Sequence, residues 1–300
     1  MQNLLIDTDP GTDDAIALLM ALNAPDARIL GVTTAGGNAS LAHTTKNVLA
    51  VLEHMGRTQV PVAKGASHPQ AGGQYRYGYD FHGHRGIGVH FPHASNVVAQ
   101  QDAAGFMERI LTASAEPVTL LALAPLTNVA HLLQRAPLAA RRIARLLVMG
   151  GALEKGNVTP YAEFNFYNDP EAAALVLASG LPVTLVPLET CAQVMLNVKD
   201  LARWRDADAP AARLADRILY KWFQRQPGHR LYDPCDPLAL AVALAPAIAS
   251  YEVGAVTVDT SQSETRGRME FRPGPGPVSV AKQVDVAAFH SLLDTLLLKT

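Results

Sequence analysis

Short apolar runs bounded by turn residues alternate along the first two thirds of the chain with longer segments whose apolar residues recur every three or four positions. The short runs predict buried strands, and the longer period predicts amphipathic helices. Strands that alternate with crossover helices form a mainly parallel sheet. We therefore expect an α/β fold with strands at residues 4–7, 29–34, 60–65, 118–123, 145–151 and 182–187, and crossover helices at 16–23, 41–55, 103–114 and 170–179.

The last third of the chain has a different pattern. Charged helical sequence covers 199–226, and an apolar helix is predicted at 236–245, followed by short strands at 252–258, 267–271 and 277–284 and a helix at 285–298. No linker-like composition or repeat divides the sequence. We expect a single domain over residues 1–300, with a mainly parallel central sheet flanked by helices and a small β-rich C-terminal extension. A long irregular segment, 65–95, is typical of a functional lid or a disordered loop.

Composition narrows the class of protein. The 300 residues are 49% hydrophobic and 17% charged, as in a compact globular protein, and the net charge is −2 without a basic stripe, which disfavours nucleic-acid binding. The longest apolar stretch, 238–249, contains a proline and falls short of the roughly 20 residues that span a bilayer, so no membrane partner is expected. The first residues lack the pattern of a secretory signal, and two cysteines are too few for a disulfide framework. We expect a cytoplasmic protein.

The most informative segment is DTDPGTDDA, in which Asp7, Asp9, Asp13 and Asp14 follow the first strand and open a helix. Ligands bind at this carboxyl end of strands in open α/β sheets. One or two such residues would be explained by a helix cap and a turn, but four within eight residues raise one another's pKa unless a cation compensates. Ligation by oxygen alone favours Ca²⁺ or Mg²⁺ over Zn²⁺. Asp236, before another helix, is the best further ligand, with helix capping as its alternative role.

Other polar segments follow strands at the same edge. Asn38 lies in AGGN, Met149 precedes a glycine pair, and Glu163 and Asn165 belong to AEFNFYNDPEAA. Taken singly, each segment also suits a turn, close backbone packing or a helix cap. Together they face one cleft, where amide and carboxylate groups around a metal suit hydroxyl groups. A vicinal diol that chelates the metal suggests a sugar substrate.

Six ordered segments, DTDPGTDDAIALL, AGGN, APLTNVA, VMGGA, AEFNFYNDPEAA and DPLA, make the sequence similar over nearly its whole length to the nucleoside hydrolases, the inosine-uridine preferring family. The resemblance implies a single α/β domain, one bound Ca²⁺ ion, and hydrolysis of ribonucleosides to a free base and ribose. It also implies a small-molecule ribonucleoside as the partner and a homodimer or homotetramer.

The resemblance also implies roles for individual residues. Asp9 matches the general base that deprotonates a calcium-bound water, and the calcium ligands match Asp9, Asp14, Asp236 and the backbone carbonyl of Leu123. The positions that bind the ribose hydroxyls match Asp13, Asn38, Asn157, Glu163 and Asn165, and Met149 matches a residue that lines the pocket.

Activation of the leaving base is where the sequence departs from the family. Cys235 occupies the position before the metal-binding Asp at which well-known relatives have histidine. A thiol is a weak proton donor, and Cys235 also suits simple packing. His82, His229 and Tyr232 are the other candidates to protonate the base. A zinc site among the five histidines between residues 68 and 93 is a competing interpretation, although no cysteine joins them and a flexible lid is favoured.

Two other classes of protein remain open. In a haloacid-dehalogenase-like phosphatase, Asp7 would be the nucleophile and Asp9 the acid, with Mg²⁺, but Pro10 breaks that motif's spacing. In a non-catalytic nucleoside-binding or ribose-binding protein, a water-activating Asp9 would have no purpose. We therefore favour a calcium-dependent ribonucleoside hydrolase.

Overall fold

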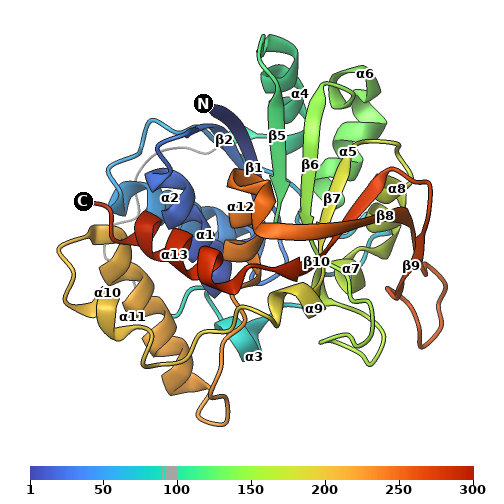
Figure 1. The fold of residues 1–300 in the computed structure, drawn as a ribbon. Helices are drawn as coiled ribbons and strands as arrows, with labels where there is room; N and C mark the ends of the chain where they lie inside the picture. Colours follow the sequence, from blue (N-terminus) through green and yellow to red (C-terminus); the bar gives the residue numbers. More distant parts are fainter. Residues whose placement is uncertain (90, 92–99) are drawn as a thin grey trace.

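The computed structural model describes residues 1–89, 91 and 100–300. These residues form one ten-stranded sheet with the order β4-β3-β2-β1-β5-β6-β7-β10-β8-β9 (Figure 1). The strands are β1 Gln2–Thr8, β2 Ala27–Thr34, β3 Val62–Lys64, β4 Gln100–Gln101, β5 Val118–Ala122, β6 Ile143–Met149, β7 Val183–Val186, β8 Ala249–Val258, β9 Met269–Pro273 and β10 Val278–Val284. Strands β1 to β7 run parallel to their neighbours, β10 pairs parallel with β7, and β8 pairs antiparallel with both β10 and β9. The predicted α/β class with a mainly parallel sheet is confirmed.

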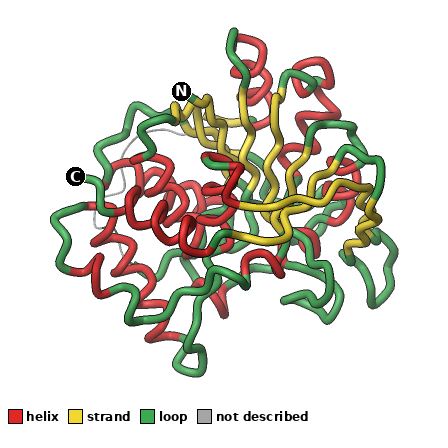
Figure 2. The backbone as a smooth tube through the Cα atoms, viewed as in Figure 1, coloured by secondary structure: helices red, strands yellow, loops and turns green. Residues whose placement is uncertain are grey.

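Helices cover both faces of this sheet (Figure 2). Helices α1, α2, α12 and α13 lie on one face, and α4, α5 and α8 lie on the other. The helices of the described residues are α1 Thr12–Asn23, α2 Leu41–His54, α3 Tyr79–His82, α4 Ala103–Ala113, α5 Thr127–Arg135, α6 Pro137–Ala140, α7 Phe164–Asn168, α8 Pro170–Leu177, α9 Leu188–Cys191, α10 Ala202–Arg205, α11 Pro210–Arg225, α12 Cys235–Leu244, the 3₁₀ helix η1 Pro246–Ile248, and α13 Val286–Leu297.

Two hydrophobic cores fill the spaces between the sheet and its helices. On β1, Leu4 and Ile6 join the core beneath α1 and α12, whereas Leu5 joins the core beneath α4 and α5. Successive side chains of a strand point to opposite faces, and both faces are covered here. The central strands are therefore nearly continuous apolar runs, which is the pattern that identified them in the sequence.

The β-rich C-terminal segment extends the same sheet. Strand β10 pairs parallel with β7, and β8 and β9 complete that edge. Val278 and Val280 of β10 are fully buried in the core shared with α4 and α5. The extension thus supplies three strands and part of the core on one side.

Some element boundaries differ from those expected. Helix α1 begins at Thr12 rather than 16, so Asp13 and Asp14 form its first turn, where negative charge is favoured. The charged segment 199–226 contains two helices, because Pro210 starts α11 and cannot donate to the preceding turn. The sequence did not predict the two-residue strand β4 or the helices α3, α5, α6, α7 and α9. Most of these elements are too short to give a periodic signal.

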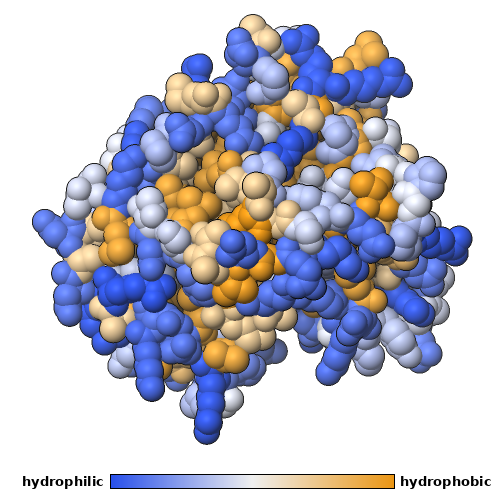
Figure 3. Space-filling view, viewed as in Figure 1, coloured by the Kyte–Doolittle hydropathy of each residue, from blue (hydrophilic) through white to orange (hydrophobic). Residues whose placement is uncertain are grey.

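The surface mixes hydrophilic and hydrophobic side chains in the view of Figure 3. Strand β8 and helix α13 carry three exposed apolar side chains, Tyr251, Val253 and Val286. No helix within the described residues is both long enough and apolar enough to cross a membrane.

Helix α12 allows a test of this packing. Leu238 is fully buried in the core beneath α1, and replacing it with alanine should lower the free energy of unfolding by about 2–5 kcal/mol through lost burial and a residual cavity. Leu138→Ala is the matched control because Leu138 is 76% exposed, and its effect should be within about 0.5 kcal/mol. Urea unfolding of both variants gives the comparison; equal losses would contradict the placement of α12.

Candidate active site

The carboxyl ends of the central strands meet along one edge of the sheet, toward α3 and α9 in Figure 1. A cavity of about 520 Å³ opens there. The predicted residues that line it are Leu123 and Asp236 of the metal set, Asp13, Asn38, Met149, Asn157, Glu163 and Asn165 of the ribose set, and His82, His229 and Cys235 of the leaving-group set. Segments more than 200 residues apart in the sequence thus contribute to one cavity, as the strand-end pattern predicted.

Asp14 is the most strongly hydrogen-bonded carboxylate of the site. Its Oδ1 accepts from the hydroxyl of Thr8 and from the Asp9 N–H at 3.2 Å. Its Oδ2 accepts from the Gly11 N–H at 2.9 Å and from Nδ2 of Asn38 at 3.0 Å. The turn between β1 and α1 is therefore wrapped around this carboxylate, which fixes its position.

Asp9 is fully buried against the turn that follows β2. Its Oδ2 accepts from the Asn38 N–H at 2.6 Å. A Cβ atom on Gly37 would lie 2.0 Å from the same oxygen, so only glycine allows this approach. The glycine pair of AGGN has a function beyond that of a turn, because it lets the backbone reach the carboxylate.

Asp13, Asp14 and Asp236 bring carboxylate oxygens within 4.8 Å of one another, and no other group of three or more His, Cys, Asp or Glu side chains in the described residues does so. Burial first, and then neighbouring carboxylates, raise the pKa of Asp13 to about 8 and the pKa values of Asp9 and Asp236 well above the usual range. Oδ1 of Asp13 is buried and has no hydrogen-bond partner among the described residues. An all-oxygen set that lacks compensating donors fits a hard divalent cation.

The competing zinc site gains no support within the described residues. His68, His82 and His84 belong to no group of metal-ligating side chains there. His90 and His93 lie outside the described residues.

The opposite wall is built from β5, β6 and α7. Glu163 caps α7: its Oε1 accepts from the Asn165 N–H at 2.9 Å, and its Oε2 accepts from the Gly151 N–H at 2.9 Å. Burial raises the pKa of Glu163 to about 7 in spite of these donors. Nδ2 of Asn165 donates to the carbonyl oxygens of Leu123, at 2.9 Å, and Met149, at 3.2 Å. The predicted metal-binding carbonyl is therefore fixed by a residue of the ribose set.

His82 lies in α3 and is 7% exposed. Its Nδ1 accepts from the Thr12 N–H at 3.0 Å, so this distant imidazole caps α1 where Gly11 has no side chain to do so. The bond leaves the ring proton on Nε2. Burial and the nearby Arg225 guanidinium lower the pKa of His82 to about 3. At neutral pH His82 can offer a hydrogen bond from Nε2 but is not an imidazolium acid.

Cys235 and Tyr232 are also held in their protonated forms. The Cys235 thiol is hydrogen-bonded to Cys191, and this contact together with burial raises the pKa of Cys235 well above its usual range. Tyr232 is 1% exposed and packs against Trp222 with ring centroids 4.7 Å apart. Burial raises the pKa of Tyr232 as well. Substrate contact by Tyr232 stays a prediction, because its ring lies within an aromatic cluster behind the cavity.

Sequence reasoning did not identify Phe81 or Asp233, which both line the cavity. Phe81 packs edge-to-face on Trp222 at 5.1 Å and faces Tyr232 at 6.1 Å. Neither residue belongs to a spaced motif: Phe81 lies in the four-residue helix α3, and Asp233 lies on the segment between α11 and α12, and both reach the cavity only through the fold.

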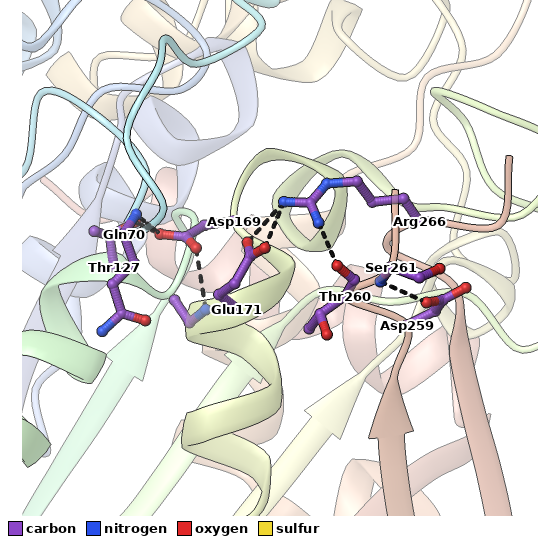
Figure 4. Close-up of polar contacts among 9 residues, drawn as sticks. Gln70, Thr127, Asp169, Glu171, Asp259, Thr260, Ser261 and Arg266 are labelled. Carbon is purple, nitrogen blue, oxygen red and sulfur yellow. Dashed lines mark hydrogen bonds and ion pairs between the residues drawn. The ribbon is translucent and has the colours of Figure 1, made fainter. Parts of the chain in front are cut away.

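The described part of the long loop, 65–89, is anchored from several sides. Oδ2 of Asp169 accepts from the Gln70 N–H at 2.8 Å and from the Thr127 hydroxyl at 2.6 Å, while its Oδ1 caps α8 (Figure 4). Asn168 accepts from the Arg76 N–H at 2.7 Å. Asp169 is thus the N-cap of α8, and together with Asn168 it holds the loop that carries His82.

Fold and site together define an α/β protein with a cavity large enough for a small ligand and a cluster of oxygen ligands that could hold a metal ion. The chain belongs to the inosine-uridine preferring nucleoside hydrolase family, whose profile matches residues 4–291.

Individual relatives match over nearly their full length. Probable uridine nucleosidase 1 of Oryza sativa subsp. japonica is 35% identical over 311 residues, covering 98% of this chain and 96% of that protein. The pyrimidine-specific ribonucleoside hydrolase RihA of Salmonella paratyphi B is 36% identical over 303 residues, covering 97% and 96%. The solved purine-preferring ribonucleoside hydrolase from Gardnerella vaginalis has 29% identity and a TM-score of 0.92, with 100% of both chains covered.

Asp169 provides a test of the loop anchor. Asp169→Ala removes the acceptor of the Gln70 and Thr127 bonds and the cap of α8, and should lower the free energy of unfolding by about 1–3 kcal/mol. Trypsin should also cleave faster after Arg76, because the loop is released. Glu171→Gln is the control, because Glu171 lies on α8, the helix that Asp169 caps. This change weakens a partly exposed ion pair between Glu171 and Arg266 and should change the free energy of unfolding by about 0–1 kcal/mol. Unchanged cleavage in Asp169→Ala would refute the anchor.

Proposed function

We propose that this chain hydrolyses the N-glycosidic bond of ribonucleosides to a free base and ribose, with a Ca²⁺ ion held by Asp9, Asp14, Asp236 and the Leu123 carbonyl. The observation that carries the proposal is the buried group of Asp13, Asp14 and Asp236 at the cavity. Its oxygen-only donors suit calcium, and amide and carboxylate groups suited to ribose hydroxyls line the same cavity.

A bound Ca²⁺ would supply acidification of water and orientation of the ribose hydroxyls. Asp9, fixed by the Asn38 N–H, accepts the proton of the attacking water. The hydroxyls are held by Asp13, Asn38, Asn157, Glu163 and Asn165, with Met149 beside them. As the C1′–N bond breaks, positive charge develops on the ribose ring, and the surrounding carboxylates stabilise it.

The phosphatase alternative loses support from the position of Asp7. This residue is fully buried, and its Oδ1 accepts from the Thr33 hydroxyl at 2.6 Å and from Nδ2 of Asn128 at 2.8 Å. A carboxylate committed to these donors beneath the strand end is poorly placed as a nucleophile. The binding-protein alternative leaves the position of Asp9 beside the carboxylate cluster without a purpose.

The proposal also covers the domain organisation, the oligomeric state and the location of the protein. One hydrolase domain over residues 1–300 is favoured because the C-terminal strands complete the central sheet. A homodimer or homotetramer is proposed from the family resemblance, and a cytoplasmic location from the sequence. Relatives of similar identity are named for uridine, pyrimidine or purine nucleosides, so base preference must come from the chain's own cavity.

Asp9→Asn tests the catalytic base. The amide keeps an oxygen near Asn38 but cannot take a proton, so kcat for ribose release should fall by about 10²–10⁴ while nucleoside binding persists. Asp259→Asn, in a separate surface pocket, is the control. A reducing-sugar assay over inosine, adenosine, guanosine, uridine and cytidine measures the loss. Near-normal turnover of Asp9→Asn would disprove the assigned base, and wild-type binding of inosine without ribose release would support a binding protein.

The raised pKa values predict how calcium-free protein responds to pH. Between 3.8 and the folded pKa values of about 7 for Asp7 and about 8 for Asp13, the folded protein retains protons that the unfolded chain has released. The free energy of unfolding therefore decreases as pH rises. With EGTA present, the melting temperature should fall by about 5 °C or more between about pH 5 and about pH 8.

Calcium should reverse this loss, since it replaces the protons as the compensating charge. The rise in melting temperature on adding Ca²⁺ should be larger at the higher pH, and EGTA should abolish ribose release. Equal calcium shifts at both pH values, or full activity of metal-free protein, would argue against the calcium site.

A further inference from the structure

Phe81, His229 and Asp233 line the cavity and belong neither to the predicted metal ligands nor to the predicted ribose-binding residues. Phe81 belongs to α3, and the other two lie on the segment between α11 and α12. If the proposed function holds and the ribose lies against Glu163 and Asn165, the base of the nucleoside extends toward these three side chains. Their chemistry then decides which bases are accepted.

The cavity carries an excess of negative charge. The carboxylates of Asp13, Glu163, Asp233 and Asp236 line it, whereas Lys155 is the one lysine or arginine among its described lining residues. Asp236 belongs to the proposed metal set, and Asp13 and Glu163 belong to the ribose set, whereas Asp233 belongs to neither. Burial raises the pKa of Asp233, and the charge of His229 opposes that rise. An anionic group is therefore available at the base end.

An aromatic ring lines the same cavity as this carboxylate. Phe81 is 36% exposed, and its ring packs against Trp222 and Tyr232. An aromatic ring stabilises a cation above its face, and a flat base stacks on it as well. A cavity that offers both a carboxylate and a partly exposed aromatic ring is thus complementary to a flat, positively charged base.

Two of the candidate proton donors are held in contacts with the protein. Nδ1 of His82 accepts from the Thr12 N–H, and the Cys235 thiol is hydrogen-bonded to Cys191. A neutral purine or pyrimidine leaves as an anion unless it gains a proton. A base that already carries a positive charge leaves as a neutral molecule and needs no acid.

We propose that this enzyme prefers ribonucleosides whose base is cationic through N-alkylation, with Asp233 and Phe81 recognising the charged base. The inference rests on the proposed function. In the reaction, the water oxygen forms a bond to C1′, and its proton passes to Asp9. The electron pair of the C1′–N bond moves to the base and cancels its positive charge, so no further proton donor is required.

The matched probes are 7-methylguanosine and guanosine, which differ by one methyl group and one charge. We expect kcat/KM for 7-methylguanosine to exceed that for guanosine by about 100-fold after each value is divided by the uncatalysed hydrolysis rate at the same pH. Asp233→Asn should reduce this selectivity about tenfold. Glu264→Gln, which removes an exposed charge on the β8–β9 connection, should leave the selectivity unchanged.

Two further measurements separate recognition from reactivity. In the Asp9→Asn protein, calorimetry should show about tenfold tighter binding of 7-methylguanosine than of guanosine, and Asp233→Asn should remove that difference. Cys235→His, which introduces a candidate acid, should lower the selectivity by accelerating guanosine hydrolysis.

The outcomes distinguish the two levels of the proposal. If uridine, inosine and guanosine are cleaved and the corrected rate for 7-methylguanosine shows no advantage, the preference for cationic bases is wrong and the hydrolase function stands. An equal effect of Asp233→Asn on both probes would also overturn the inference. If none of the nucleosides is cleaved, the proposed function itself fails.

Discussion

The repulsion among buried carboxylates at the end of β1 is the constraint on which the rest of the site depends. Asp7 lies in β1, Asp9 lies in the turn that follows, Asp13 and Asp14 lie in the first turn of α1, and Asp236 joins them from α12. Burial penalises each negative charge, and each charge penalises the others. Backbone and side-chain donors satisfy Asp14, whereas Oδ1 of Asp13 has no partner among the described residues, so a bound cation would stabilise this edge of the fold.

The fold supplies what these carboxylates require. Parallel strands bring the ends of β1, β2, β5 and β6 to one edge, so Asn38, Leu123 and Met149 surround the cluster without any of them being near it in sequence. Further hydrogen bonds fix the groups that line the cavity. Asn165 donates to two backbone carbonyls, and Asp169 holds the loop that carries His82. Such outer contacts orient the groups that touch metal and substrate.

Where the chain departs from its relatives, the chemistry of the cavity changes in a consistent way. At Cys235, where the family resemblance implies a histidine, the thiol is hydrogen-bonded to Cys191, while burial and the nearby Arg225 guanidinium keep His82 neutral. Both groups are thereby weakened as proton donors to the base. In the proposal made above, the Asp233 carboxylate and the partly exposed ring of Phe81 recognise positive charge instead.

The sequence by itself determined the α/β class and the central strands, because hydrophobic periodicity is a local property. The spacing of carboxylates predicted a cation site, and the family resemblance supplied the metal and ribose roles, which stay predictions. The sequence also indicated Asp236, since an acid before a helix is visible in a short segment. The tertiary structure alone decided that His82 caps α1, that Asp169 anchors the loop, and that Phe81 and Asp233 face the cavity. These contacts join residues far apart in the chain, and the same packing sets the burial and neighbours that shift each pKa, which no local pattern records.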